Sequence, residues 1–107
     1  MSDVPNMRRA ISRILGDPKP QVVLWVKDGC PYSMNAIQFF KNEHRKKIIS
    51  VNQLPYDVVK FSNELETALL KKYGRSIGTY PKIIVNGVFI GGFSDLIALY
   101  KATSNGQ

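Results

Sequence analysis

The sequence predicts an α/β fold in which helices flank a four-stranded mixed sheet, with an extra helix at the N-terminal end. Three observations predict this class. The apolar run at residues 22–26 is typical of a strand buried on both faces, and helical patterns lie on either side of it. Asn86-Gly87 between two apolar runs indicates a two-residue β-hairpin. A length of 107 residues suits a single domain, which we take to be residues 1–107 with a core at about 21–101.

Helices and strands are expected to alternate in the first half of the chain. A helix is predicted over residues 7–15, where apolar residues recur on one helical face before a glycine and a proline. A strand follows over residues 21–27, then a helix from residue 31 to about 45 and a second strand over 48–51. Residues 54–61 fit neither pattern clearly. The first two strands, joined by a helical crossover, should be parallel.

The second half is expected to contain a helix, the hairpin and a final helix. Residues 63–73 form the first of these, with Asn63 and Glu66 as a capping box and Gly74 at its end. The hairpin strands are predicted at residues 82–85 and 88–90. Ser94 is expected to cap a final helix that continues to about residue 102, and Asp95 falls in its first turn.

The chain is basic, with 15 Lys and Arg residues against 8 Asp and Glu and a formal net charge of +7. Such a charge permits binding of nucleic acid or of small anions. The basic residues form several groups, and two of these groups are expected at helix C-termini, where cations complement the helix dipole. Their members are Lys41, Arg45, Lys46 and Lys47, and then Lys71, Lys72 and Arg75. We therefore expect neither a nucleic-acid surface nor a nucleic-acid partner.

Cysteine usage and hydropathy exclude other classes. The single cysteine, Cys30, excludes a disulfide-bonded scaffold and a cysteine-rich zinc site, so no metal is expected. The longest apolar run has the length of a strand, so we expect no membrane association. The N-terminal residues show no secretory signal, and a reducing cytoplasmic location is the expectation.

Cys30 is placed where a buried strand gives way to a helix that begins at Pro31. Backbone N–H groups without helical partners and the helix dipole stabilise a thiolate at such a position. The dipole alone lowers a thiol pKa from about 8.5 by up to about one and a half units. The alternative is a small buried cysteine without reactivity. The only histidine, His44, lies on a basic segment away from this position and is not expected to act as an acid or base.

Three segments resemble the glutaredoxin family. Lys27-Asp28-Gly29-Cys30-Pro31-Tyr32-Ser33 is similar to its active-site segment, whose usual form is Cys-Pro-Tyr-Cys, so this chain has a Cys-Pro-Tyr-Ser variant. Thr79-Tyr80-Pro81 resembles the segment with the family's cis-proline, where valine more often precedes the proline. Gly91-Gly92-Phe93-Ser94-Asp95 resembles the glutathione-binding motif. The three segments occur in the order that the family has.

The resemblance implies a thioredoxin-like fold and a site for glutathione as co-substrate. Cys30 would be the nucleophile, with Pro31 and Ser33 as auxiliary residues and no second cysteine for an internal disulfide. Arg75 is a candidate for the groove residue that the family has near its third helix. The glutathione-binding residues that the resemblance implies are Lys27, Tyr32, Thr79, Tyr80, Pro81, Gly92, Phe93, Ser94 and Asp95.

Three functions remain open from the sequence. The first is a glutathione-dependent thiol–disulfide oxidoreductase that reduces glutathione mixed disulfides through Cys30 by a monothiol mechanism. Its partners would be glutathione and glutathionylated proteins, and a monomer is expected. The second is a dimeric carrier of a glutathione-ligated iron–sulfur cluster, although Pro31 and Tyr32 make the helix start stiffer and bulkier than in such carriers. The third is a non-catalytic basic binding module that keeps only the fold.

Overall fold

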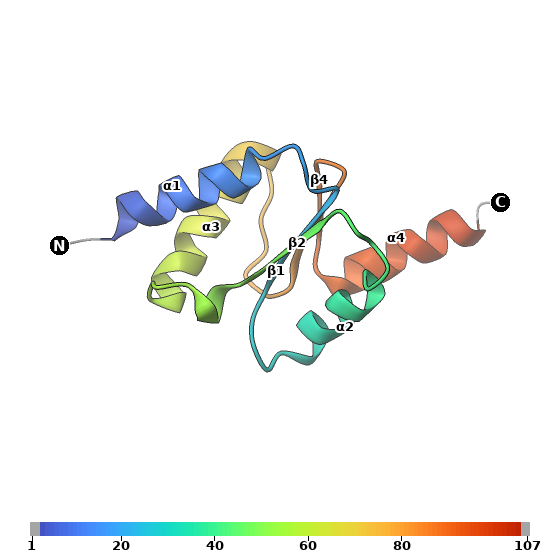
Figure 1. Cartoon of the computed structure of the whole chain (residues 1–107). Helices are drawn as coiled ribbons and strands as arrows, with labels where there is room; N and C mark the ends of the chain where they lie inside the picture. The colour runs from blue at the N-terminus through green and yellow to red at the C-terminus, as the bar shows by residue number, and fades with distance from the viewer. Residues whose placement is uncertain (1–2, 106–107) are drawn as a thin grey trace.

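The computed structural model describes residues 3–105 and contains the predicted four-stranded mixed sheet, in the order β2-β1-β3-β4 (Figure 1). The central strand β1 (Val22–Val26) runs parallel to the edge strand β2 (Lys46–Ser50). On its other side, β1 pairs antiparallel with β3 (Lys82–Val85), which forms a hairpin with β4 (Val88–Gly91). The parallel pair and the hairpin confirm the predicted sheet.

Two pairs of helices cover the sheet (Figure 1). The extra N-terminal helix α1 (Val4–Leu15) packs with α3 (Val58–Tyr73) on one face. The other face is covered by α2 (Pro31–Phe39) and α4 (Phe93–Asn105). A single 3-10 turn, η1 (Val51–Gln53), follows β2. None of the helices in the described part of the chain combines the length and the apolar character needed to cross a membrane.

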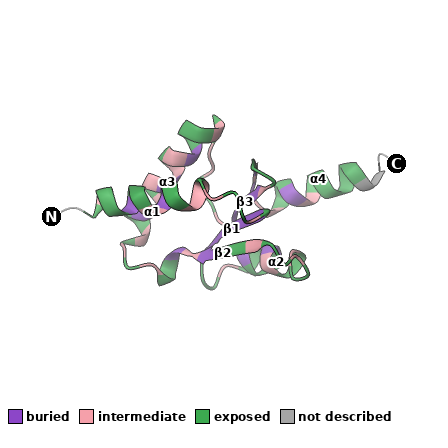
Figure 2. Cartoon of the chain, turned by 45° about the horizontal axis from the view of Figure 1, so that its top comes forward, coloured by how far each residue is buried: buried purple, intermediate pink, exposed green. Residues whose placement is uncertain are grey.

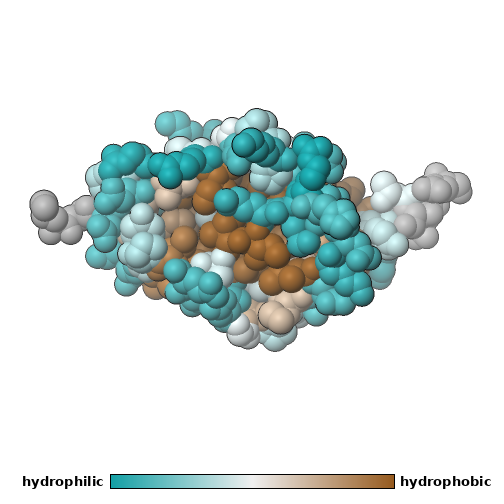
Figure 3. All heavy atoms as spheres, in the orientation of Figure 1, coloured by the Kyte–Doolittle hydropathy of each residue, from teal (hydrophilic) through white to brown (hydrophobic). Residues whose placement is uncertain are grey.

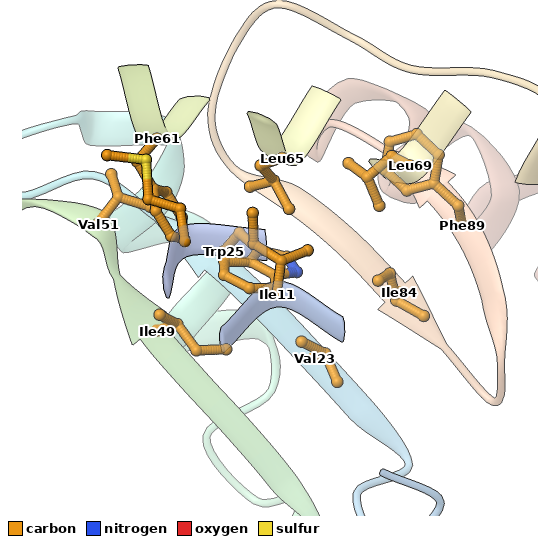
Figure 4. Packing of buried hydrophobic residues seen from close by; sticks show 11 residues of the cluster. Ile11, Val23, Trp25, Ile49, Val51, Phe61, Leu65, Leu69, Ile84 and Phe89 are labelled. Carbon is orange, nitrogen blue, oxygen red and sulfur yellow. The ribbon is translucent and has the colours of Figure 1, made fainter. Parts of the chain in front are cut away.

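Apolar side chains fill both faces of β1, as its sequence predicts. Trp25 points toward α1 and α3 and packs with Phe61 and Leu65 in the larger core cluster (Figure 4). Leu24 points to the opposite face and packs with Ala36 in a second cluster under α2 and α4. The buried positions accordingly concentrate along the sheet in Figure 2. The sheet thus lies between two cores. Successive side chains of β1 point to opposite faces of the sheet, and those on both faces are apolar.

The helix α2 is shorter than predicted, because it ends at Phe39 and not near residue 45. Phe40 is its C-cap, and the chain then turns, with the Arg45 N–H donating to Glu43 Oε1 at 2.9 Å. β2 already begins at Lys46, whose ammonium donates to the Glu43 carbonyl at 2.7 Å. The prediction that the basic residues between positions 41 and 47 lie at a helix C-terminus is therefore wrong. Lys41 and Arg45 lie in the turn, and Lys46 and Lys47 lie in the edge strand β2.

That edge strand remains partly open to solvent. Ile48, in the middle of β2, is more than one-third exposed. Figure 3 shows apolar atoms around the middle of the face that Figure 1 presents, with hydrophilic side chains around them. Lys46 and Lys47 at the start of the strand are charged residues of the kind that discourages pairing with a second edge.

The helix α3 begins five residues earlier than predicted. Asp57 caps it by accepting the Lys60 N–H at 2.9 Å. The proposed capping box of Asn63 and Glu66 is therefore wrong, and both residues lie inside the helix. Its end agrees with the prediction, because Gly74 adopts the left-handed conformation with φ of 77°. Residues 54–61 fit neither a helix nor a strand pattern clearly, so the sequence does not indicate that α3 begins within them.

The hairpin turn has the predicted conformation. Asn86 and Gly87 have φ values of 50° and 77°, as the two central positions of a type I′ turn require. Val85 and Val88 pair across it. This turn lies at the end of the sheet opposite Cys30, because Val22, at the start of β1, pairs with Val85, whereas Cys30 follows the end of β1.

Candidate active site

Cys30 is the N-cap residue of α2, as predicted. Pro31 occupies the first turn of the helix, and the Cys30 carbonyl accepts the Met34 N–H at 3.1 Å. The Cys30 N–H donates to the Lys27 carbonyl at 3.2 Å, which closes the turn between β1 and α2. The thiol therefore projects from the start of a helix and is only partly buried. This is the environment in which a thiolate is stabilised.

Opposing effects act on the pKa of Cys30. Burial of the thiol raises this pKa. A larger combined effect lowers it, and it comes from the backbone N–H of Ser33, the Ser33 hydroxyl, the backbone N–H of Tyr32 and the positive charge of Lys27. The net result is a pKa below that of a free thiol. The direction agrees with the helix-start argument, because two of these contributions are N–H groups in the first turn of α2.

Ser33 links the thiol to the preceding turn. Ser33 is 1% exposed, and its Oγ accepts the Lys27 N–H at 3.2 Å. Since that contact uses a lone pair, the hydroxyl proton stays available for the Cys30 sulfur. Ser33 therefore has two roles, as an acceptor for the backbone and as a donor to the thiolate.

We expect Cys30 to titrate below a free thiol and Ser33→Ala to raise its pKa by less than about one unit. The N–H groups of Ser33 and Tyr32 and the charge of Lys27 remain in this variant, and water can reach a partly buried sulfur in place of the hydroxyl. Thiolate absorbance against pH measures the shift, with the rate of alkylation by a neutral reagent as a check. A rise well above one unit would identify the Ser33 hydroxyl as the principal stabiliser.

The thiol faces the loop before β3. Cys30 Sγ donates to the Tyr80 carbonyl at 3.7 Å, and the Tyr80–Pro81 peptide bond is cis, as the resemblance implied. The Tyr80 side chain turns toward α3, where its hydroxyl shares a hydrogen bond with Ser62 at 2.8 Å. Two segments that are distant in the sequence therefore meet at the sulfur.

A groove of about 370 Å³ lies next to this contact. It brings together eight of the nine residues that the resemblance implied for glutathione, all except Lys27, which is exposed beside Cys30. Ile77 is an additional wall residue that the sequence did not indicate. The lining residues are Tyr32, Ile77, Thr79, Tyr80, Pro81, Gly92, Phe93, Ser94 and Asp95.

The start of α4 forms one end of this groove, and its cap differs from the prediction. The helix begins at Phe93, so Ser94 lies inside its first turn and is not the cap. Asp95, also in the first turn, supplies the side-chain contact at this helix start instead, because its Oδ2 accepts the Gly92 N–H at 2.9 Å. A carboxylate that reaches back from the third helical position is one half of a capping box. The first turn of α4 lines the groove, and the N–H groups at the start of a helix have no acceptor within the helix.

Arg75, the remaining groove candidate, and the single histidine both lie outside the groove. The Arg75 guanidinium donates to the carbonyls of Phe89 and Ile90 at 3.2 and 3.4 Å and rests over the Phe89 ring, so Arg75 does not line the groove. His44 is exposed in the turn before β2, at the end of the sheet opposite Cys30. Within residues 3–105, no three His, Cys, Asp or Glu side chains cluster in a way that could hold a metal ion.

Sequence reasoning also missed Lys82, a fully buried lysine at the start of β3, directly behind the loop that forms the groove wall. Its ammonium donates to two backbone carbonyls of that loop. The signal in the sequence is a charged residue directly after Pro81, at the head of the apolar run that continues with Ile83. Such a residue is usually placed at the exposed end of a strand.

The sequence of the chain matches a model of the glutaredoxin family over residues 22–90. The chain belongs to the glutaredoxin family. The rat protein "Glutaredoxin-2, mitochondrial" is 32% identical over 80 residues, which cover 75% of this chain and 47% of that protein. This glutaredoxin chain therefore spans about half the length of such curated relatives.

Solved glutaredoxin structures have the same thioredoxin-like fold. The crystal structure of wheat glutaredoxin superposes with a TM-score of 0.67 at 27% identity, covering 92% of this chain and 83% of the wheat chain. The crystal structure of a buckwheat glutaredoxin–glutathione complex has a TM-score of 0.70 at 18% identity, covering 94% of this chain and 84% of the other. Both comparisons agree with the four-stranded mixed sheet and its flanking helices.

Proposed function

We propose that this glutaredoxin is a glutathione-dependent thiol–disulfide oxidoreductase that reduces glutathione mixed disulfides through Cys30 alone. The observation that supports it best is the contact between Cys30 Sγ and the Tyr80 carbonyl, because Tyr80 is also a wall of the groove. A thiol with a lowered pKa is thereby adjacent to a groove of the size of a small peptide. The partners are glutathione and glutathionylated proteins, and we place the reaction in a reducing compartment such as the cytoplasm.

The reaction needs one protein thiol. The Cys30 thiolate attacks the glutathione sulfur of the mixed disulfide, the sulfur–sulfur bond breaks, and the substrate leaves as a thiolate that takes up a proton. A Cys30–glutathione disulfide forms in the same step. The thiolate of a second glutathione then attacks the sulfur of the bound glutathione, which releases oxidised glutathione and restores the Cys30 thiolate. Ser33 is no obstacle, since neither step uses a second cysteine.

Residues of the groove, together with the exposed Lys27 beside Cys30, suit the two charged ends of glutathione. The N–H groups at the start of α4 can bind a carboxylate, and the exposed Asp95 carboxylate can pair with an ammonium group. Lys27 offers a point charge for the second carboxylate. Tyr80 can offer its backbone to an extended peptide in the manner of an added strand. The net charge of +7 favours encounter with anionic glutathione, modestly at physiological salt.

The proposal is tested by steady-state turnover of a glutathione–cysteine mixed disulfide with reduced glutathione as the reductant. We expect saturation in the mixed disulfide and a large loss of rate when cysteine replaces glutathione in both substrates. Equal rates with both thiols would contradict glutathione dependence. A visible chromophore together with a dimer after anaerobic reconstitution with iron and sulfide would instead support the cluster carrier.

Gly91→Ala is expected to weaken binding of glutathione in this groove by about tenfold or more. Gly91 has φ of 115°, and an added Cβ would lie 2.5 Å from Asp95 Oδ2, so the carboxylate that caps α4 must move. Strain at such a backbone conformation costs about 1–3 kcal/mol. Gly87→Ala is the matched control, because its φ is 77° and an added Cβ would meet no atom within 4 Å. Titration with S-methylglutathione should separate the two variants, and equal affinities would contradict the role given to Asp95.

A further inference from the structure

The ammonium group of Lys82 is enclosed behind the groove wall. Lys82 is 0% exposed, and its Nζ donates to the Ile77 carbonyl at 2.8 Å and to the Thr79 carbonyl at 3.0 Å. Both of these residues line the groove. One buried cation therefore fixes two points of the loop that leads into β3.

The same ammonium also contacts the next residue of the wall. Nζ lies 4.3 Å from the centre of the Tyr80 ring, and Glu66 Oε2 on α3 lies 4.0 Å from it. The Tyr80 hydroxyl is in turn held by Ser62. Three wall residues, at positions 77, 79 and 80, are thus tied through Lys82 to the helix behind them.

A buried lysine destabilises the fold at this position unless its ammonium group finds polar partners. Burial of an ammonium group is unfavourable, and two carbonyl acceptors, an aromatic face and a carboxylate are the kinds of partner that compensate for it. Burial lowers the pKa of Lys82, and the Glu66 carboxylate acts in the opposite direction. An apolar residue would fill the same space but would leave the carbonyls of Ile77 and Thr79 without this donor.

We propose that Lys82 is a positioning residue that sets the shape of the groove wall and thereby the affinity for the glutathione moiety. The inference rests on the proposed function, because it assigns glutathione to this groove. Lys82 belongs to β3, whereas the thiol belongs to the N-cap residue of α2, and the effects that lower the pKa of Cys30 come from residues 27, 32 and 33. Loss of Lys82 should therefore weaken binding of glutathione and leave the reactivity of the thiolate intact.

The test is Lys82→Met, which removes the charge and the donors at similar volume. We expect the Kd for S-methylglutathione, an unreactive probe, and the KM for a glutathione mixed disulfide each to rise about tenfold, equivalent to about 1.4 kcal/mol. The kcat and the rate of Cys30 alkylation by iodoacetamide should stay within about twofold of wild type on this mechanism. Lys72→Met is the matched control, because its Nζ also donates to a backbone carbonyl, that of Leu15, away from the groove.

The outcomes separate the two proposals. Wild-type protein that binds S-methylglutathione without turning over mixed disulfides would refute the proposed function. The Kd of Lys82→Met for the same probe would still test whether Lys82 positions the groove wall. An unchanged Kd and KM in folded Lys82→Met, or a loss of alkylation rate equal to the loss of affinity, would overturn the positioning role. If Lys82→Met does not fold, Lys82→Gln gives the same comparison, since its shorter neutral amide cannot replace both carbonyl contacts of the ammonium. A wild-type chain with no affinity for the probe would refute both proposals.

Discussion

Cys30→Ser is expected to reduce turnover of a glutathione mixed disulfide by at least about 10³-fold, the scale seen when a catalytic nucleophile is removed. A serine hydroxyl does not ionise near neutral pH, so the first turn of α2 would stabilise an alkoxide that scarcely forms. The chain has no other cysteine that could take over the attack. The measurement is the steady-state rate with reduced glutathione, corrected for the uncatalysed exchange between thiols and disulfides.

The matched control is Asn35→Ala, an exposed position on the same helix. Its rate should stay close to that of the wild type, and circular dichroism should show that both variants are folded. Residual turnover of Cys30→Ser above a few per cent of the wild-type rate would contradict the assignment of Cys30 as nucleophile.

Phe61→Ala is expected to lower the free energy of unfolding by about 3–5 kcal/mol. Phe61 is 1% exposed, and its ring lies 6.0 Å from that of Trp25 and stacks at 5.8 Å on that of Tyr56. The cavity left by the ring would lie between α3 and the sheet, where the structure has little room to collapse. Since a domain of this size has about 5–15 kcal/mol in total, the variant should be close to unfolding at physiological temperature.

Urea denaturation followed by tryptophan fluorescence measures this loss, because Trp25 is the only tryptophan and lies in the same cluster. Val59→Ala is the control on the same helix, because Val59 is 69% exposed. We expect its free energy of unfolding to change by less than about 0.5 kcal/mol. Similar losses in the two variants would mean that the packing under α3 is not the main source of stability.

Local determinants explain which parts of the fold were predictable. The Asn86-Gly87 turn and the Cys30-Pro31 helix start each depend on the conformational preferences of two adjacent residues, and both are as predicted. The boundaries of α2 and α3 were not predictable in this way. α3 takes Asp57 as its cap ahead of a segment without clear periodicity, and α2 stops at Phe39 although its sequence would allow more helix.

The candidate site divides in a similar way. Eight of the nine residues that the resemblance implied for glutathione lie together in one groove beside Cys30, and Lys27 lies outside it. Ile77 and Lys82 were missed because their roles exist only in three dimensions. A buried lysine becomes acceptable when a loop folds back and presents its carbonyls, and neither the hydropathy nor the spacing of the sequence records that arrangement. The contact between the thiol and Tyr80 joins residues 50 positions apart and is equally invisible to local reasoning.

The central claim is that Cys30 forms a mixed disulfide with glutathione, and intact-mass spectrometry tests it most directly. After incubation with oxidised glutathione, the wild-type chain should gain the mass of one glutathionyl group, and an added thiol should remove it. Asn35→Ala should behave in the same way, and Cys30→Ser should gain nothing. A wild-type chain that stays unmodified under conditions that modify a free cysteine peptide would contradict the account.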